Sequence, residues 1–190
     1  WELLIVNDAS SDDSAQLLQD WSRRHPQLRV ITLRKDELRT LPGKKYALDK
    51  GIAAAKFDTL LLTDADCQPA SDQWLRLFAQ KKTVSGKAII LGYGAYFARS
   101  GFLNRFIRWE TVHTATQYLG LARSGNPYMG VGRNLMYEKQ LYDEAKKDNA
   151  FWKVYRQTPS GDDDLLIGKF ATTTNVNWCI SEQTLTRSLP

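Results

Sequence analysis

The segment from Thr59 to Asp66 constrains the fold more than any other, because it is an apolar run that ends abruptly in two carboxylates. It reads Thr-Leu-Leu-Leu-Thr-Asp-Ala-Asp. Such a run is typical of a strand buried on both faces, as in a parallel sheet covered by helices. Open α/β sheets bind ligands at the carboxyl ends of their strands, and Asp64 and Asp66 lie at that end.

Asp64 and Asp66 flank a single alanine, so in extended geometry both side chains point to the same side of the strand. Two carboxylates held this close repel each other unless a cation or a proton separates them. A hard divalent cation such as Mg²⁺ or Mn²⁺, shared with a phosphate, suits such a pair. The sequence therefore predicts a divalent-metal site here.

Strand and helix signals alternate through the first 85 residues. The expected strands are 2–8, 29–33 and 59–64, and the expected helices are 44–56, 72–82 and one capped by Ser10 or Ser11 that runs to residue 24. This β-α-β-α-β-α order predicts an α/β fold with a mostly parallel central sheet and helices on both faces.

After residue 85 the alternation becomes less regular. The expected strands are 87–93, 134–137 and 174–180, and the expected helices are 102–121, 138–147 and 164–170. No repeat and no linker interrupts the chain, so we expect one domain over residues 1–190. Because the sequence begins within a strand and ends in a polar stretch, we expect a fragment truncated at both ends.

The charge and composition narrow the class of protein. The formal net charge of +5 suits an anionic ligand, but the basic residues form no long block, so no nucleic-acid partner is expected. No run approaches 18 apolar residues and no signal peptide is visible, so we expect this fragment to be soluble. Cys67 and Cys179 lack metal-type spacing and favour a reducing compartment.

Further candidate groups lie at the ends of other elements. Asp8 ends the first strand as Asp64 ends the third, although a helix-capping role explains Asp8 about equally well by itself. Lys44 opens a helix after a glycine, where phosphate is attracted. Asp162 and Asp163 belong to a run of three acids before an apolar helix, which exceeds what capping needs and offers a general base.

Two segments leave alternatives open. The loop 125–134 is rich in glycine, which permits either a tight turn or close approach to a ligand. The stretch from Phe102 to Tyr118 carries apolar residues at helical spacing, interleaved with Arg105 and Arg108. We favour core packing for this helix, and an interfacial helix lying on an anionic bilayer is the alternative.

Five segments, taken in order, resemble motifs of the family 2 glycosyltransferases, which are inverting enzymes with the GT-A fold. They are Val6–Asp13, Gly43–Leu48, Thr63–Asp66, Gly132–Asn134 and Gly161–Leu165. The resemblance covers nearly the whole chain. One departure is that glycine and aspartate replace the Glu-Asp pair that usually carries the catalytic base.

The resemblance implies a role for each matched residue. Asp8, Lys44 and Asp64 would bind the donor nucleotide, and Asp66 would bind the metal. The base would be Asp162 or Asp163, and alignment of the downstream Asp-Leu pair favours Asp162. The acceptor would contact the segment Gly132, Arg133 and Asn134. Residues 1–90 would form a nucleotide-binding part, and residues 91–190 an acceptor-binding part.

The family resemblance also implies the reaction and its setting. A nucleotide-diphospho-sugar would donate its sugar to a saccharide or lipid-linked acceptor, with a divalent metal neutralising the leaving diphosphate. The whole protein would be a bacterial, membrane-associated enzyme of cell-envelope polysaccharide or glycolipid synthesis. It would act at the cytoplasmic face of the membrane, held there by segments outside this fragment. A nucleotidyltransferase and a non-catalytic nucleotide-sugar-binding domain are the alternatives.

Overall fold

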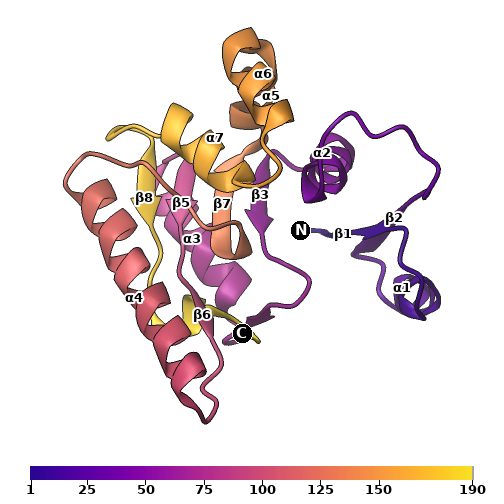
Figure 1. Cartoon of the computed structure of the whole chain (residues 1–190), viewed down its shortest axis with the longest axis horizontal. Coiled ribbons are helices and arrows are strands. Elements are labelled where there is room, and N and C mark those ends of the chain that lie inside the picture. The colour runs from indigo at the N-terminus through magenta and orange to yellow at the C-terminus, as the bar shows by residue number, and fades with distance from the viewer. Residues whose placement is uncertain (190) are drawn as a thin grey trace. The chain divides into compact units, whose positions relative to one another are not determined.

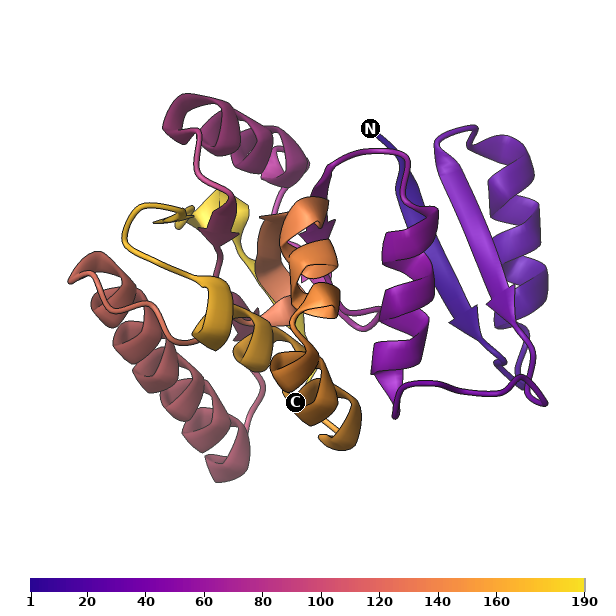
Figure 2. The same cartoon turned by 90° about the horizontal axis from the view of Figure 1, so that it is seen from above.

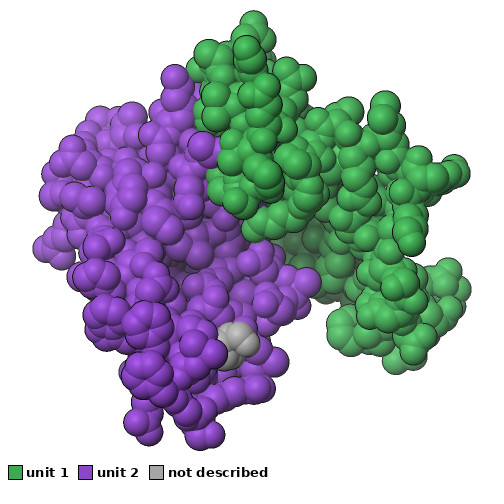
Figure 3. Space-filling model, in the orientation of Figure 1, with its two compact units in different colours: residues 1–60, 146–161 green, residues 61–145, 162–190 purple. Residues whose placement is uncertain are grey.

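The computed structural model describes residues 1–189, and Pro190, the last residue of the predicted domain, lies outside them. The chain divides into two compact units, which Figure 3 colours separately. Unit 1 comprises Trp1–Leu60 and Lys146–Gly161, and unit 2 comprises Leu61–Ala145 and the chain from Asp162 onward. That the whole chain is one domain, with parts at 1–90 and 91–190, stays a prediction.

Unit 1 is built on two parallel strands. Strand β1 (Leu3–Asp8) pairs with β2 (Leu28–Leu33) along their whole length. Parallel neighbours need a crossover connection, and α1 (Ser14–Arg24) provides it. Helix α2 (Lys44–Ala54) packs on β1 and α1 packs on β2, so the strand pair has a helix on each side, as expected (Figures 1 and 2).

The first helix begins later than the cap at Ser10 or Ser11 predicts. Two side chains bond to the backbone ahead of the helix: Asn7 Oδ1 accepts from Ser10 N at 3.1 Å, and Asp12 Oδ1 accepts from Ser14 N at 3.1 Å. Such local side-chain bonds compete with helix formation. The segment between β1 and Ser14 therefore forms turns, and α1 starts at Ser14.

A lysine ties distant segments of unit 1 together. Lys45 is fully buried, and its Nζ donates to the carbonyl oxygens of Tyr155 at 3.0 Å and Thr158 at 2.8 Å. The ammonium also lies 4.1 Å from the centre of the Tyr155 ring. These carbonyls belong to the end of α6 (Asn149–Gln157), a helix that the sequence did not predict. Lysine is a favourable partner for a helix C-terminus.

Unit 2 contains a four-stranded sheet of order β3-β7-β5-β8. The strands are β3 (Thr59–Leu62), which starts at the end of unit 1, β7 (Leu135–Glu138), β5 (Ile89–Leu91) and β8 (Val176–Trp178). Strand β5 runs parallel to β8 but antiparallel to β7. The α/β class is confirmed, but the strand directions are mixed, because non-local pairing joins β7 to β5 in the opposite sense.

A smaller sheet completes the strands of unit 2. In it β9 (Thr186–Ser188) pairs antiparallel with β4 (Gln68–Pro69) and parallel with β6 (Gly94–Tyr96). The strand expected at 87–93 is present but shorter, as β5, and β6 follows it as a separate strand that was not predicted. Neither β4 nor β9 was predicted, since each has only two or three residues and lacks a periodic signal.

Helices and 3-10 turns enclose the sheets of unit 2. They are α3 (Trp74–Ser85), α4 (Phe102–Arg123), η1 (Gly132–Asn134), α5 (Lys139–Lys147), α7 (Asp162–Phe170) and η2 (Glu182–Thr184), and the last two residues of α5 belong to unit 1. Helix α3 packs against β5 and η2, while α4 packs against β6 and β8. Within residues 1–189, none of the helices combines the length and apolar character that a bilayer crossing requires.

The core of unit 2 lies around β5, which is completely buried, rather than around β3. Thr59 is exposed and Leu60–Leu62 are half-buried, so the expectation that this run is buried on both faces is wrong. The reason is the position of β3 at the edge of its sheet, with β7 as its neighbour there. Local apolar content cannot distinguish an edge strand from a central one.

Candidate functional site

Asp64, Asp66 and Cys67 form an acidic turn directly after β3. The backbone N–H of Cys67 donates to the carbonyl oxygen of Asp64 at 3.0 Å, so the chain turns here instead of staying extended as predicted. The turn nevertheless gathers the side chains, since one ligand atom from each of the three lies within 4.8 Å of the others. Asp66 is exposed.

The chemistry of this turn suits a hard cation. Burial raises the pKa of the Cys67 thiol, and the charges of Asp66 and Asp64 raise it further. A protonated thiol is a poor ligand for Mg²⁺ or Mn²⁺, whereas carboxylate oxygens are good ones. Asp64 and Asp66 therefore fit a divalent ion, and Cys67 fits the role of a half-buried neighbour.

Gly132 holds a candidate base in place. Its backbone N–H donates to Asp163 Oδ2 at 2.7 Å, and a Cβ at this position would lie 2.1 Å from the same oxygen. Only glycine lets the carboxylate approach so closely. Asp162 is buried, with 4% of its surface exposed, while Asp163 is half-buried. Both lie in the first turn of α7, where the helix dipole favours negative charge.

Asn134 is engaged inside unit 2. Its Oδ1 accepts from Trp74 Nε1 at 3.0 Å, and its Nδ2 donates to the carbonyl oxygens of Tyr93 at 2.9 Å and Thr184 at 2.8 Å. The residue is completely buried. These bonds connect η1 to α3, η2 and the chain after β5. Asn134 therefore positions the two residues before it, Gly132 and Arg133.

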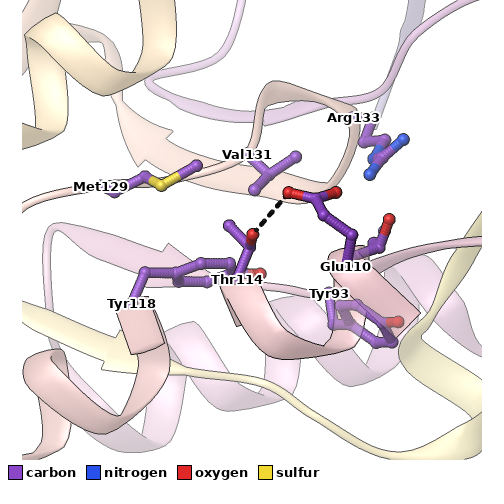
Figure 4. Close-up of a pocket in the computed structure, with 9 residues that line it drawn as sticks. Tyr93, Glu110, Thr114, Tyr118, Met129, Val131 and Arg133 are labelled. Atoms are coloured by element: carbon purple, nitrogen blue, oxygen red, sulfur yellow. Dashed lines mark hydrogen bonds between the residues drawn. The ribbon is translucent and has the colours of Figure 1, made fainter. Parts of the chain in front are cut away.

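Arg133 faces a pocket that the sequence did not reveal (Figure 4). The pocket has a volume of about 120 Å³ and is lined by Tyr93, Gly94, Glu110, Thr111, Thr114, Tyr118, Met129, Val131 and Arg133. Met129, Val131 and Arg133 belong to the glycine-rich loop 125–134, and the other lining residues carry no motif. The lining residues other than Arg133 come from α4, from the loop before η1 and from the chain around β6, which only the tertiary fold brings together.

The pocket combines an apolar wall with a few polar groups. Among the buried side-chain nitrogen and oxygen atoms that the structure describes, Arg133 Nε is the one that has no hydrogen-bond partner. The Arg133 guanidinium lies 4.5 Å from the centre of the Tyr96 ring, and a Cβ on Gly94 would collide with it. The Glu110 carboxylate accepts from Thr114 Oγ1 at 3.0 Å. Figure 4 marks this hydrogen bond with a dashed line.

Two tyrosines of the pocket have raised pKa values. The Tyr118 hydroxyl donates to the carbonyl oxygen of Gly92 at 2.7 Å, and burial raises its pKa far above the usual range. Burial also raises the pKa of Tyr93, but the charges of Arg133 and Arg108 oppose that shift. The Arg133 charge likewise opposes the rise in the pKa of Cys67. Arg133 is therefore within electrostatic reach of both the pocket and the acidic turn.

Asp8 and Lys44 belong to unit 1. Asp8 ends β1 as predicted, and its carboxylate accepts two bonds from Arg39, at 2.9 and 2.6 Å, which lower its pKa. Arg39 was not predicted, because its loop carries no motif. Lys44 begins α2 at an exposed position after Gly43, whose φ of 53° suits glycine. That these residues share one donor site with the acids of unit 2 stays a prediction.

The fold is similar to that of a solved structure. It matches the crystal structure of S. aureus TarS residues 1–349 in complex with UDP-GlcNAc, with a TM-score of 0.64 and 15% identity. The match covers 100% of this chain and 49% of that one. At this level of identity the likeness shows the fold alone, which is the GT-A fold of glycosyltransferases.

The family follows from the sequence. Residues 1–145 match the family described as Glycosyl transferase family 2. The chain belongs to this family.

Curated relatives agree with the family. The chain is 29% identical over 108 residues to the dolichyl-phosphate beta-glucosyltransferase ALG5C of Trichomonas vaginalis, covering 55% of this chain and 31% of that protein. It is 34% identical over 65 residues to the poly-beta-1,6-N-acetyl-D-glucosamine synthase of Staphylococcus epidermidis, covering 34% and 14%. The chain thus spans less than a third of either relative.

Proposed function

We propose that this chain transfers a sugar from a nucleotide-diphosphate donor to an acceptor hydroxyl with inversion, assisted by a divalent metal. The observation that carries the proposal is the acidic turn. This chain belongs to glycosyltransferase family 2, and its Asp64 and Asp66 lie together in that turn. UDP-GlcNAc in the TarS complex supports a nucleotide-sugar donor. Asp66 would hold the metal, with Asp64, Asp8 and Lys44 on the donor nucleotide.

The metal, when bound, neutralises charge on the diphosphate as it leaves. The acceptor hydroxyl must lose a proton on the opposite face of the sugar, and a carboxylate of α7 takes it. Asp162 is supported by its alignment with the family's base, and Asp163 by its bond to Gly132 next to the pocket. A single displacement then inverts the anomeric carbon.

The pocket beside Arg133 suits the acceptor. A sugar offers hydroxyl oxygens to the unsatisfied Arg133 Nε–H and hydroxyl hydrogens to Glu110, while its apolar ring face suits Tyr118 and Val131. Because Arg133 directly follows Gly132, a sugar in this pocket would lie close to the Asp163 carboxylate. The acceptor would be a saccharide or a lipid-linked molecule.

The setting belongs to the same proposal. The relatives' names include a polysaccharide synthase and a dolichyl-phosphate glucosyltransferase, which support a polymeric or lipid-linked acceptor. We therefore propose that the whole protein acts in cell-envelope polysaccharide or glycolipid synthesis at the cytoplasmic face of the membrane. No observation favours nucleotidyl transfer.

Donor hydrolysis tests the proposal. The chain is incubated with a panel of nucleotide-sugars and Mn²⁺, and release of the nucleoside diphosphate is measured for wild type, Asp162→Asn and Asp163→Asn. We expect metal-dependent release that one of the two variants loses by about 10²-fold or more. Asp66→Ala should abolish metal-dependent donor binding in calorimetry, whereas Asp58→Ala, an exposed acid ahead of β3, should not.

Three outcomes are informative. Donor binding without turnover in the wild type would support the non-catalytic alternative. Activity that survives in both α7 variants would remove these residues as the base. Binding curves for Asp66→Ala that match those of the wild type would refute the metal assignment.

A further inference from the structure

Helix α4 presents a row of large apolar side chains to solvent. We call this surface the α4 stripe: Phe102, Leu103, Phe106, Trp109 and Val112, with exposed fractions of 83%, 68%, 50%, 60% and 52%. Core packing, the favoured sequence interpretation of the apolar residues from Phe102 to Tyr118, is therefore wrong for Phe102, Phe106, Trp109 and Val112, whereas Tyr118 is buried as expected. Large contiguous apolar patches on a protein surface mark interaction sites.

The aromatic rings of the stripe lie close to one another along the helix, and the ring of His113 continues their row. The centroids of Phe102 and Phe106 are 6.4 Å apart, those of Phe106 and Trp109 are 5.9 Å apart, and those of Trp109 and His113 are 5.4 Å apart. The spacing of four, three and four residues keeps these rings on one face of the helix. Phe102, Phe106, Trp109 and His113 thus form a continuous aromatic ridge.

The opposite side of α4 accounts for its packing within unit 2. Thr111, Ala115, Tyr118 and Ala122 are buried there. Near the start of the helix, Asn104 accepts from Arg99 N at 2.7 Å and donates to the carbonyl oxygen of Phe97 at 3.1 Å. Figures 1 and 2 both show α4 at the rim of unit 2. The fold of unit 2 thus secures the helix without using the stripe.

The charges beside the stripe indicate what it contacts. Arg105 and Arg108 are exposed and interleave with the rings, and Arg123 ends the helix. The acidic residue of α4, Glu110, accepts a hydrogen bond from Thr114 and lines the pocket. Exposed aromatic rings with arginines beside them are typical of a helix that lies in the headgroup region of an anionic bilayer.

We propose that the α4 stripe docks this domain on an anionic lipid surface. The rings of Phe102, Phe106 and Trp109 enter the boundary between headgroups and acyl chains, while Arg105 and Arg108 bind lipid phosphates. The helix lies in the plane of the surface and does not cross it. A ridge rather than a groove fits a deformable lipid surface. This inference is independent of the proposed transfer reaction.

Vesicle sedimentation of the 190-residue chain tests the proposal. Phosphatidylcholine vesicles with and without phosphatidylglycerol are compared, and the bound fraction is measured. We expect binding to the anionic vesicles, reduced about tenfold or more in the double variant Phe106→Ser/Trp109→Ser. The matched control is Leu17→Ser/Trp21→Ser, which removes two exposed apolar side chains of α1 and should leave binding unchanged.

Further arms separate lipid docking from self-association and from misfolding of a variant. Arg105→Gln/Arg108→Gln should weaken binding to anionic vesicles and reduce its dependence on salt. Circular dichroism of each variant reports whether it still folds. The proposal would be overturned if the wild type did not bind anionic vesicles. It would also be overturned if the stripe and control variants lost vesicle binding equally. Self-association that the stripe variant abolishes, without vesicle binding, would assign the stripe to a second copy instead.

Discussion

At the scale of single residues, the candidate site depends on Gly132, because glycine has no side chain. Gly132 lets the Asp163 carboxylate reach its backbone N–H, and one added methyl group would occupy the position of that carboxylate. Neither residue signals the other in the sequence, because they are 31 positions apart. The same short turn places Arg133 at the pocket, so the backbone here positions both the Asp163 carboxylate and the Arg133 side chain.

Gly132→Ala should therefore impair turnover more than stability. The added Cβ displaces Asp163, and misplacing a catalytic group by about 1 Å can reduce the rate by about 10²-fold. The measurement is kcat for donor hydrolysis beside the unfolding midpoint. Gly120→Ala on α4 is the control, since its Cβ would have no neighbour within 4 Å. Equal kcat values for the two variants would contradict the assignment.

The Asp8–Arg39 pair predicts a pH dependence of stability. Hydrogen bonds from Arg39 lower the pKa of Asp8 in the folded state. Its stabilising contribution is therefore present above the unfolded pKa of about 3.9 and is lost as the pH falls through the lower folded value. Asp8→Asn should lower the melting temperature at neutral pH, and the difference from wild type should shrink in acid. A constant difference from pH about 7 to about 2 would contradict this.

At the scale of elements, α4 serves two surfaces. Glu110, Thr114 and Tyr118 line the pocket on one side, while the α4 stripe faces solvent on the other. The sequence shows apolar residues around much of this helix, so periodicity alone does not say which of them are buried. The acidic turn is a second example. The sequence predicts that the strand continues through these residues, but a backbone hydrogen bond turns the chain there.

Glu110→Gln tests the pocket as an element of acceptor binding. The amide keeps the size of the carboxylate but weakens its hydrogen bonds to sugar hydroxyls, so the acceptor KM should rise about tenfold. Donor hydrolysis without acceptor should not change. The control is Glu182→Gln, an exposed acid outside the pocket. An unchanged acceptor KM would exclude Glu110 from the subsite while leaving the proposed reaction untouched.

At the scale of the whole molecule, both units are discontinuous in sequence. The chain leaves unit 1 at residue 60, returns at 146 and leaves again at 161, directly before the candidate base. Unit 1 thus depends on contacts between its first 60 residues and the returning segment. Lys45 provides two of them, across 110 and 113 residues of sequence.

Lys45→Met should destabilise unit 1. The variant leaves the carbonyl oxygens of Tyr155 and Thr158 without their donor, at a cost of about 1–3 kcal/mol in the free energy of unfolding. Urea denaturation monitored by circular dichroism measures it. Lys35→Met, at an exposed position, should change little. Equal midpoints for both variants would show that the buried ammonium contributes nothing to the fold.

The sequence by itself determined the strands that end in Asp8 and precede Asp64, the helices that begin at Lys44 and Phe102, and the acids that open α7. These follow from periodicity and capping, which act over a few residues. Tertiary structure alone decided the mixed strand directions, the edge position of β3, the Gly132–Asp163 contact, the pocket and the outward face of α4. Each of these depends on which distant segments pack together, and no short-range pattern contains that information.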